Sequence, residues 1–186
     1  LEISRISPEL FDGVSCVYVS GYLAVHGDLL PEICGLAGKA GARMAFDAAA
    51  QGMIEGFRDV FDRIIEHIDI LFVNEDEARA LTGREPDEAL RELAENREVT
   101  IVKTGGEVSL ISCKGNFYRI PVVKAEVVDT TGAGDTYAAG FLHKYLAGES
   151  AEDAGQFASR LAAKVVAKIG ARFTAEEWVE IINELG

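Results

Sequence analysis

The chain has 186 residues, 48% of them hydrophobic, so it is long enough to bury a sizeable core as one domain. Its formal net charge of −13 argues against nucleic acid and anionic membranes as partners, and no apolar run approaches the length of a membrane span. No signal peptide is visible at Leu1, and three widely spaced cysteines predict free thiols in a reducing cytoplasm. Because the first residue is not Met, we expect a piece of a longer, cytoplasmic protein.

The first half of the chain alternates predicted strands with predicted helices. Strands are expected at residues 16–23, 43–47 and 70–74, and helices at 30–40, 57–68, 75–81 and 87–95. Strands separated by helices of this length imply βαβ units. The pattern therefore predicts an α/β fold with a mainly parallel sheet.

The second half begins with strands that have no helices between them. These strands are expected at residues 99–103, 108–112 and 117–120, and three helices follow at 133–147, 151–169 and 175–185. The Lys114-Gly115-Asn116 turn makes the last two strands an antiparallel hairpin. Helical spacing places an apolar stripe on one face of the 151–169 helix, which predicts core packing. The stripe consists of Ala158, Leu161, Ala162, Val165, Val166 and Ile169.

The stretch VVDTTGAGD at positions 127–135 joins a strand end to a helix through a glycine turn. Glycines let successive amides point at one spot, and the amino end of a helix favours an anion there. An acid beside such an anion hole is a candidate base for a hydroxyl that attacks a phosphoryl group. The candidate base is Asp135, and the candidate amides are those of Gly132, Ala133 and Gly134. Simple helix capping is the alternative, but the strand–turn–helix context favours a phosphotransferase.

The segment DTTGAGD at 129–135 resembles the second signature of the ribokinase-like (PfkB) sugar and nucleoside kinases. The segment NEDE at 74–77 matches the N-x-x-E motif of that family, and VKTG at 102–105 resembles its strand entering the nucleotide site. Residues 161–172 resemble the helix and loop that close over the adenine. Essentially all of the chain aligns, but only to the C-terminal part of such a kinase. The resemblance implies a ribokinase-like three-layer α/β core, with the N-terminal strands and lid absent from this chain.

The resemblance also implies a function: transfer of the ATP γ-phosphoryl to a primary alcohol of a sugar or nucleoside. Residues 1–186 would be the nucleotide-binding and catalytic part of the kinase domain. The expected nucleotide-binding residues are Asn74, Lys103, Gly105, Gly134 and Ser159. Asn74 and Glu77 would lie around Mg²⁺ and the phosphates, largely through water. Asp129 and Thr131 would hold a monovalent cation such as K⁺.

Several of these assignments have a structural alternative. Asn74 and Glu77 are spaced as a capping box, and Asp129 could merely cap its turn. Ser159 could hydrogen-bond near the adenine or simply face solvent. The loop after Lys103 lacks the second glycine of the family's G-x-x-G, although Gly105 is present.

The expected partners are a small sugar or nucleoside, and a second copy of the whole protein in a homodimer. Within the family, the chain looks most like bacterial adenosine-kinase-like members. Because the sugar contacts and the lid of such kinases come mostly from the N-terminal part, this chain alone is expected to lack activity. The alternative is a catalytically silent nucleotide-binding or regulatory fragment. A Rossmann dehydrogenase is disfavoured, because no G-x-G-x-x-G follows the strand expected to end at Leu23.

Overall fold

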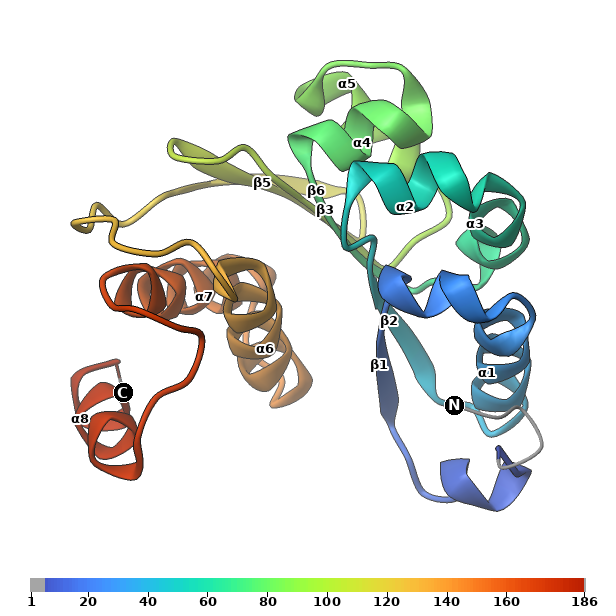
Figure 1. Cartoon of the computed structure of the whole chain (residues 1–186), viewed down its shortest axis with the longest axis horizontal. Coiled ribbons are helices and arrows are strands. Elements are labelled where there is room, and N and C mark those ends of the chain that lie inside the picture. Colours follow the sequence, from blue (N-terminus) through green and yellow to red (C-terminus); the bar gives the residue numbers. More distant parts are fainter. Residues whose placement is uncertain (1–5, 186) are drawn as a thin grey trace. The chain divides into compact units, whose positions relative to one another are not determined.

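The computed structural model describes residues 6–185, which pack into two compact units (Figure 1). The first unit comprises the described residues up to Gly105 together with Ser112–Phe117. The second comprises Gly106–Ile111 and the residues from Tyr118 onward. The strands form one mixed sheet in chain order, β1-β2-β3-β4-β5-β6. Within residues 6–185, no helix is long and apolar enough to cross a membrane.

The first unit is built from parallel strands joined by helices. Its strands are β1 (Cys16–Ser20), β2 (Arg43–Asp47), β3 (Ile70–Asn74) and β4 (Val99–Lys103). Its helices are α1 (Leu29–Lys39), α2 (Gln51–Gly56), α3 (Arg58–Ile64), α4 (Glu75–Thr82) and α5 (Pro86–Leu93). Short 3₁₀ turns lie at η2 (Pro8–Phe11), η3 (Gly21–His26) and η4 (Ile65–His67). Because crossovers are right-handed and the strands advance in one direction, α1 to α5 cover the same face of these strands (Figure 1).

The register of the parallel strands brings their polar ends together. Asn74 is paired with Lys103, and Asp47 is paired with Phe72, two residues before Asn74. The interiors of β2, β3 and β4 are buried, as the continuous apolar runs at these positions predict. All three strands have the bounds expected from the sequence, so the α/β prediction is confirmed for this unit. Their carboxyl ends, where open α/β sheets bind ligands, carry Asp47, Asn74 and Lys103.

The first strand is shorter than its apolar pattern predicts. It ends at Ser20, whose side chain accepts the Tyr22 N–H and starts the η3 turn. At Gly21 a Cβ would lie 2.5 Å from the Ala48 carbonyl oxygen and 3.1 Å from the Phe61 ring. The chain thus leaves the sheet where only glycine fits beside a neighbouring loop, and this contact has no local signature.

Helix α2 was not expected from the sequence. Its segment, QGMIEG, contains two glycines and has a low intrinsic helix propensity. Ile54 is fully buried, so tertiary packing stabilises the turn. The helix expected at 57–68 is present as α3 followed by the 3₁₀ turn η4.

The second unit combines a hairpin with three helices. The hairpin strands are β5 (Val108–Cys113) and β6 (Asn116–Pro121), whose ends near the turn belong to the first unit. Lys114 and Gly115 both have positive φ, 49° and 82°, as a two-residue type I′ hairpin turn requires. The helices are α6 (Ala133–Leu146), α7 (Ala151–Val166) and α8 (Ala175–Leu185).

Glycines allow close packing in the second unit. A Cβ on Gly140 of α6 would lie 3.2 Å from Ala158 Cα of α7, and a Cβ on Gly155 would lie 2.6 Å from Ile111. Leu161 of α7, whose Cδ2 would lie 3.1 Å from the same Gly140 Cβ, also packs with Ile181 and Leu185 of α8. Small residues therefore let α6 approach the backbone of α7, and let isoleucine side chains of the hairpin pack directly on α7.

The apolar stripe of α7 is only partly the core that the sequence predicted. Ala158, Leu161 and Val165 are buried, whereas Ala162 and Val166 are half-buried. Ile169 is 83% exposed, which corrects its assignment to the buried face. The helix ends at Val166, three residues earlier than expected, so Ile169 leaves the periodicity that placed it inward.

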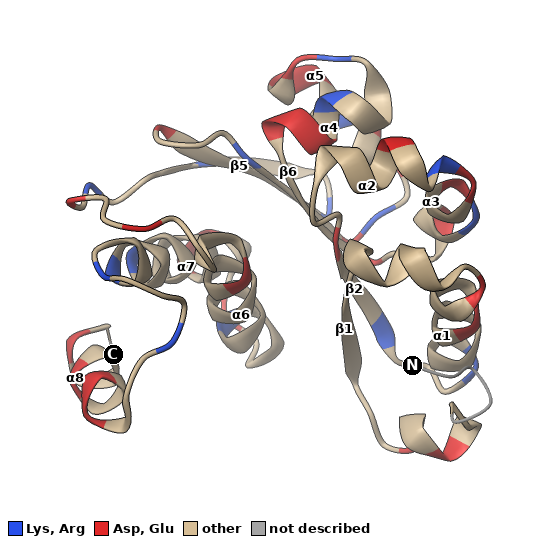
Figure 2. Ribbon diagram, viewed as in Figure 1, with Lys and Arg blue, Asp and Glu red and all other residues tan. Residues whose placement is uncertain are grey.

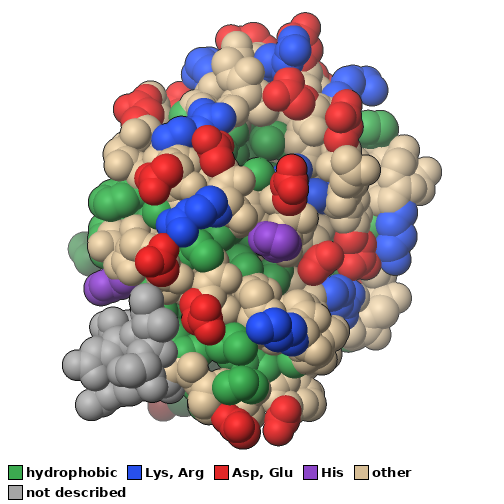
Figure 3. Space-filling model, turned by 90° about the vertical axis from the view of Figure 1, so that its right-hand side faces the viewer, with side chains coloured by type: hydrophobic (Ala, Val, Ile, Leu, Met, Phe, Trp, Pro, Cys, Tyr) green, Lys and Arg blue, Asp and Glu red, His purple; other side chains and the backbone are tan. Residues whose placement is uncertain are grey.

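Acidic residues are common in first turns of helices, as in α4, which begins with Glu75, Asp76 and Glu77 (Figure 2). These positions complement the positive end of the helix dipole. Acidic and basic side chains are interspersed on the molecular face displayed in Figure 3. Exposed ion pairs such as Arg58–Asp62 and Arg63–Asp28 accompany this mixture on α3 and beside α1.

Candidate active site

The predicted site residues fall into two groups, one in each unit. The first group lies at the carboxyl ends of β3 and β4 and contains Asn74, Glu77, Lys103 and Gly105. The second group lies at the start of α6 and in α7 and contains Asp129, Thr131, Gly132, Ala133, Gly134, Asp135 and Ser159.

The start of α6 has a geometry that only glycine permits. Gly132 is the N-cap with φ 77°, and a Cβ at this position would lie 2.4 Å from the Ala171 Cβ. Asp135 is the third residue of the helix and is exposed. A carboxylate in the first turn is favoured by the helix dipole. The glycine turn and the helix start lie where the sequence predicts. The expectation of a strand that ends at Val127 and Val128 is wrong, because β6 ends at Pro121 and these valines are 63% and 52% exposed in an irregular segment. The role of Asp135 stays a prediction.

One of the three amides predicted to face an anion is already engaged. The Ala133 N–H donates to the Thr130 carbonyl at 3.1 Å, which closes the turn before the helix. Thr136 N–H donates to the Gly132 carbonyl at 2.9 Å, so regular helical bonding begins at once. The prediction of an anion hole therefore depends chiefly on the Gly132 and Gly134 amides.

Asp129 links the glycine turn to the segment between α7 and α8. Its Oδ1 accepts the Thr131 N–H at 2.9 Å, and its Oδ2 accepts the Gly170 N–H at 3.0 Å. Hydrogen bonds from the Thr131 side chain, and then from the two amides, lower the pKa of Asp129. Both predictions for Asp129, turn cap and cation ligand, use the same carboxylate. The capping geometry is present.

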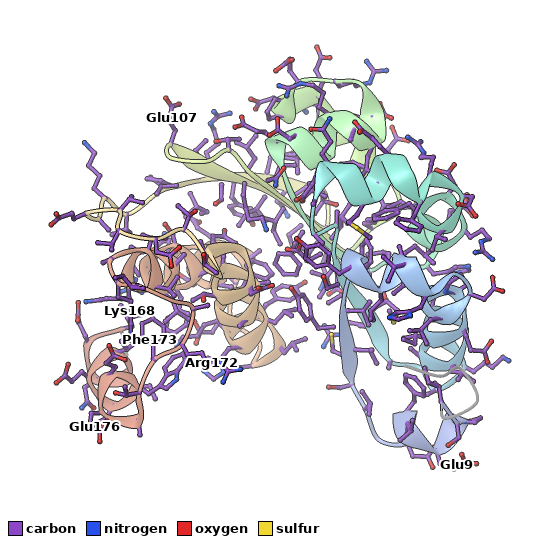
Figure 4. The ribbon with its side chains drawn as sticks, in the orientation of Figure 1. Glu9, Glu107, Lys168, Arg172, Phe173 and Glu176 are labelled. Atoms are coloured by element: carbon purple, nitrogen blue, oxygen red, sulfur yellow. The ribbon has the colours of Figure 1, made fainter. Side chains whose placement is uncertain are left out.

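The segment that Asp129 holds contains several contacts of its own. Figure 4 shows Lys168, Arg172 and Phe173 along this connection between α7 and α8. Lys168 pairs with Glu177 at 2.6 Å, and its Nζ lies 5.2 Å from the centroid of the Phe173 ring. These contacts and the Asp129 bond keep the backbone at Gly170 and Ala171 against Gly132.

In the first unit, Asn74 and Glu77 form a complete capping box. The Asn74 side chain accepts the Glu77 N–H at 2.8 Å, and a Glu77 carboxylate oxygen accepts the Asn74 N–H at 2.9 Å. The other carboxylate oxygen accepts from the Asn74 side-chain amide at 2.6 Å. Glu77 is 2% exposed, and burial raises the pKa of its carboxyl group. The capping alternative is thus real, and it places a buried acid at the sheet edge.

Lys103 is joined to an acid that sequence reasoning missed. Its Nζ lies 3.0 Å from Oδ2 of Asp47, the last residue of β2, and both side chains are largely buried. The signal was available: Asp47 ends an apolar strand at the same sheet edge as Asn74. Three neighbouring strands therefore present Asp47, Asn74 and Lys103 together, with Glu77 just beyond.

Comparison with known proteins gives this arrangement its context. Residues 4–178 match the sequence profile of the pfkB family carbohydrate kinases. The chain belongs to this family. It is 34% identical over 146 residues to a nucleoside kinase of Methanocaldococcus jannaschii, a match that covers 76% of this chain and 47% of that protein.

Solved structures support the same family and fold. An adenosine kinase from Sinorhizobium meliloti matches 99% of this chain with a TM-score of 0.88 and 29% identity, over 58% of its own length. A putative ribokinase II from E. coli, solved with ATP and Mg²⁺, matches 99% with a TM-score of 0.86 and 20% identity, over 63% of its length. The ribokinase-like α/β fold predicted from the motifs is confirmed. The chain spans between 47% and 63% of the length of these relatives.

Ser159 of the pfkB-family chain is buried and faces the hairpin. Its hydroxyl donates to the Pro121 carbonyl at 3.0 Å and accepts the Val123 N–H at 3.1 Å. The solvent-facing alternative is therefore wrong. The role near adenine stays a prediction, and the observed bonds make Ser159 an anchor for the chain that leaves β6.

Gly105 follows β4 with φ 65°, in the left-handed region that glycine favours. A Cβ there would lie 3.8 Å from a Glu75 carboxylate oxygen, an ordinary contact, so the turn and not crowding explains the residue. Val108 occupies the place of the missing second glycine, and the carbonyl of Glu107, just before it, accepts the Val122 N–H at 3.0 Å. This bond joins the two ends of the hairpin.

The side chains of the candidate site could bind Mg²⁺ or a monovalent cation with only a few direct protein ligands. Within residues 6–185, no group of three or more His, Cys, Asp and Glu side chains is arranged to hold a metal ion. Mg²⁺ commonly keeps several waters and takes one or two carboxylates, so the Asn74–Glu77 pair fits such a site. For a monovalent cation, a carboxylate offers about four lone-pair positions, and Asp129 keeps acceptor capacity beyond its amide bonds.

Proposed function

We propose that the whole protein to which this chain belongs is an ATP-dependent phosphotransferase. It moves the γ-phosphoryl group to a primary alcohol of a sugar or nucleoside. The observation that carries the proposal is the start of α6, where a glycine N-cap crowded by Ala171 is followed by the exposed acid Asp135. Membership of the pfkB family supports the same reaction class. Residues 1–186 would supply the nucleotide-binding and catalytic part.

Asp135 is the proposed general base. It would accept the proton of the attacking hydroxyl, which in a loose transition state needs to leave only late. The amides of Gly132 and Gly134 would donate to the oxygens of the transferred group, with Ala133 contributing through the helix dipole. Such donors stabilise most where charge develops in the transition state.

The edge of the first unit is the proposed nucleotide side. Asn74, Lys103 and Gly105 would bind ATP, together with Gly134 at the phosphates and Ser159 toward the adenine. Asn74 and Glu77 would hold Mg²⁺ largely through water. When bound, Mg²⁺ neutralises phosphate charge, which this acidic chain otherwise repels.

Asp129 and the Thr131 carbonyl are the proposed ligands of a monovalent cation such as K⁺. The supporting feature is that they adjoin the proposed anion hole, so a cation there would strengthen it. Replacing potassium with choline chloride at constant ionic strength should lower the transfer rate. An unchanged rate would leave Asp129 with its capping role alone.

The acceptor is proposed to be a sugar or a nucleoside. Within the family, we propose that the protein belongs with the adenosine-kinase-like members. The named relatives include a nucleoside kinase and an adenosine kinase. We further propose a cytoplasmic protein that acts as a homodimer. The net charge of −13 disfavours nucleic acid and anionic membranes as partners.

The second candidate is a catalytically silent nucleotide-binding or regulatory protein of the same fold. It is favoured by one observation: the Ala133 amide is engaged by Thr130 and is not turned toward a ligand. A pure binder needs no base, so Asp135 discriminates between the two candidates.

The experiment is an ADP-release assay on the whole protein with Mg²⁺, ATP and a panel of sugars and nucleosides. Acceptor-dependent ADP release that vanishes in Asp135→Asn supports the kinase. Tight ATP binding by calorimetry, without ADP release for any acceptor, supports the silent alternative. A protein that neither binds nor turns over ATP contradicts both.

A further inference from the structure

Asp47 lies outside the residues that the sequence motifs assign. We infer that Asp47 is a positioning residue that holds the Lys103 ammonium group at the carboxyl edge of the sheet, where the proposed function places the nucleotide. The inference rests on that proposed function. It predicts that Asp47 acts on ATP binding through Lys103.

The ion pair spans a strand. Asp47 ends β2 and Lys103 ends β4, with β3 between them, and Lys103 Nζ lies 3.0 Å from Asp47 Oδ2. The side chains are 18% and 10% exposed. A buried ammonium group is costly without a partner, so the carboxylate decides where this lysine rests. The pair crosses over the end of β3, next to Asn74.

Asp47 is itself held in place by its second oxygen. Oδ1 accepts the Ala49 N–H at 2.9 Å, and Ala49 has a left-handed φ of 72°. The Ala48 N–H donates to the Phe72 carbonyl at 3.1 Å, so the chain after β2 is fixed to β3. The carboxylate cannot swing away without disturbing this turn. Lys103 therefore pairs with a fixed anchor, which lowers the entropy cost of ordering its long side chain.

A second acid competes for the same ammonium group. The buried carboxyl group of Glu77 lies close enough to interact with the charges of both Asp47 and Lys103. Without Asp47, Lys103 would be drawn toward Glu77 and its Asn74 partner, away from its present position. An ammonium group has three donors and uses one on Asp47, so two are left for phosphate oxygens.

The test uses the whole protein and three variants: Asp47→Asn, Lys103→Gln and the double variant. Asp47→Asn keeps an acceptor for the Ala49 amide and removes the charge that holds Lys103. We expect each single variant to raise KM for ATP about tenfold, with kcat changed less than KM. The double variant should raise KM no further than Lys103→Gln alone, because both changes act through one lysine.

Asp69→Asn is the matched control. Asp69 precedes β3 at the opposite end of the sheet, and its Oδ2 accepts the Met44 N–H at 2.8 Å. It is an acid bonded to a backbone amide of the same unit, as Asp47 is, but it lies away from Lys103. This control should lower the melting temperature and leave KM for ATP unchanged.

The outcomes separate the inference from the proposed function. If the wild type transfers phosphate and Asp47→Asn matches Asp69→Asn in KM, or if the double variant is multiplicatively worse, the inference is overturned. If the wild type transfers no phosphate, the proposed function fails, and calorimetric ATP affinity replaces KM in the same comparison. Asp47→Ser also retains an acceptor for Ala49, so it replaces Asp47→Asn if that variant does not fold.

Discussion

The two groups of proposed site residues, one in each unit, are built in different ways. The start of α6 is made of backbone, and Gly132 and Asp135 lie only three residues apart at its exposed end. The edge of the first unit is made of side chains from three strands, and its ion pair joins residues 56 positions apart. Glu77 in that group is 2% exposed.

Because of this difference, we expect substitutions in the two groups to have different effects on catalysis and on stability. A change to an exposed acid at a helix start alters the reaction and little else, because solvent replaces what is lost. A change within a buried polar group leaves partners unsatisfied, so it alters stability as well as binding. The predictions below test that division.

The largest effect is expected from Asp135→Asn. Loss of the proposed base should lower kcat by about 10²–10⁴, with ATP affinity nearly unchanged. Asp153→Asn is the matched control, because Asp153 is the third residue of α7 as Asp135 is of α6. The control should keep the wild-type kcat. Steady-state assays of the whole protein measure kcat for both variants. If Asp135→Asn retained more than about half the wild-type rate, Asp135 would not be the general base.

Gly132→Ala tests whether the turn is as constrained as its geometry indicates. The new Cβ would meet Ala171 and must adopt a left-handed φ, so we expect a loss of about 2–4 kcal/mol in the free energy of unfolding. Gly148→Ala is the control, because Gly148 also has a positive φ, 97°, but a Cβ there would have no atom within 4 Å. It should cost about 1–2 kcal/mol.

Ala171→Gly should recover part of the Gly132→Ala loss by removing the clash, which denaturant unfolding can measure. Equal losses in Gly132→Ala and Gly148→Ala would show that crowding by Ala171 is unimportant.

Glu77→Gln should raise the Mg²⁺ concentration for half-maximal rate by about tenfold, as expected for groups that hold a metal through water. A metal titration at saturating ATP measures this. If Glu77 only caps α4, the variant will melt at a lower temperature with an unchanged Mg²⁺ dependence.

The same variant should change the pH dependence of stability. Because burial raises the pKa of Glu77, the folded protein binds its proton up to a higher pH than the unfolded chain does. Stability should therefore fall as pH rises from the ordinary glutamate value to the raised one, and stay level above it. Glu77→Gln lacks this fall. Denaturant unfolding of both proteins between about pH 4 and pH 8 measures it. A wild-type advantage that grows with pH would contradict the expectation.

The smallest effect is expected from Asp62→Asn. This residue pairs with Arg58 on the surface of α3, and the two side chains are 58% and 52% exposed. Such a pair contributes about 0.3–0.5 kcal/mol, and the contribution should decrease with salt. If Asp62→Asn lowered the free energy of unfolding as much as Asp47→Asn does, exposed and buried charges in this unit would not differ in their contribution to stability.

The elements that the sequence predicted well are those whose signal is local. Strands β2, β3 and β4 are apolar runs with sharp polar ends, and their bounds were predicted to the residue. The strand at Cys16 was overextended and α2 was missed, because the contact of Gly21 with Ala48 and the burial of Ile54 arise only on folding. Ile169 followed a helical period that the chain abandons at Val166.

The sequence by itself determined the family, the order of the six strands and of every α-helix except α2, and the glycine turn with its acid, because each depends on neighbours along the chain. Only the tertiary structure decided that Ala133 is engaged, that Ser159 is buried and that Asp47 anchors Lys103. The contacts of Ser159 and Asp47 depend on partners that are distant in sequence. The bond of the Ala133 amide depends on which local hydrogen bond the backbone forms at the turn. Burial makes such partners obligatory, and a linear pattern contains no information on which residues will be buried together.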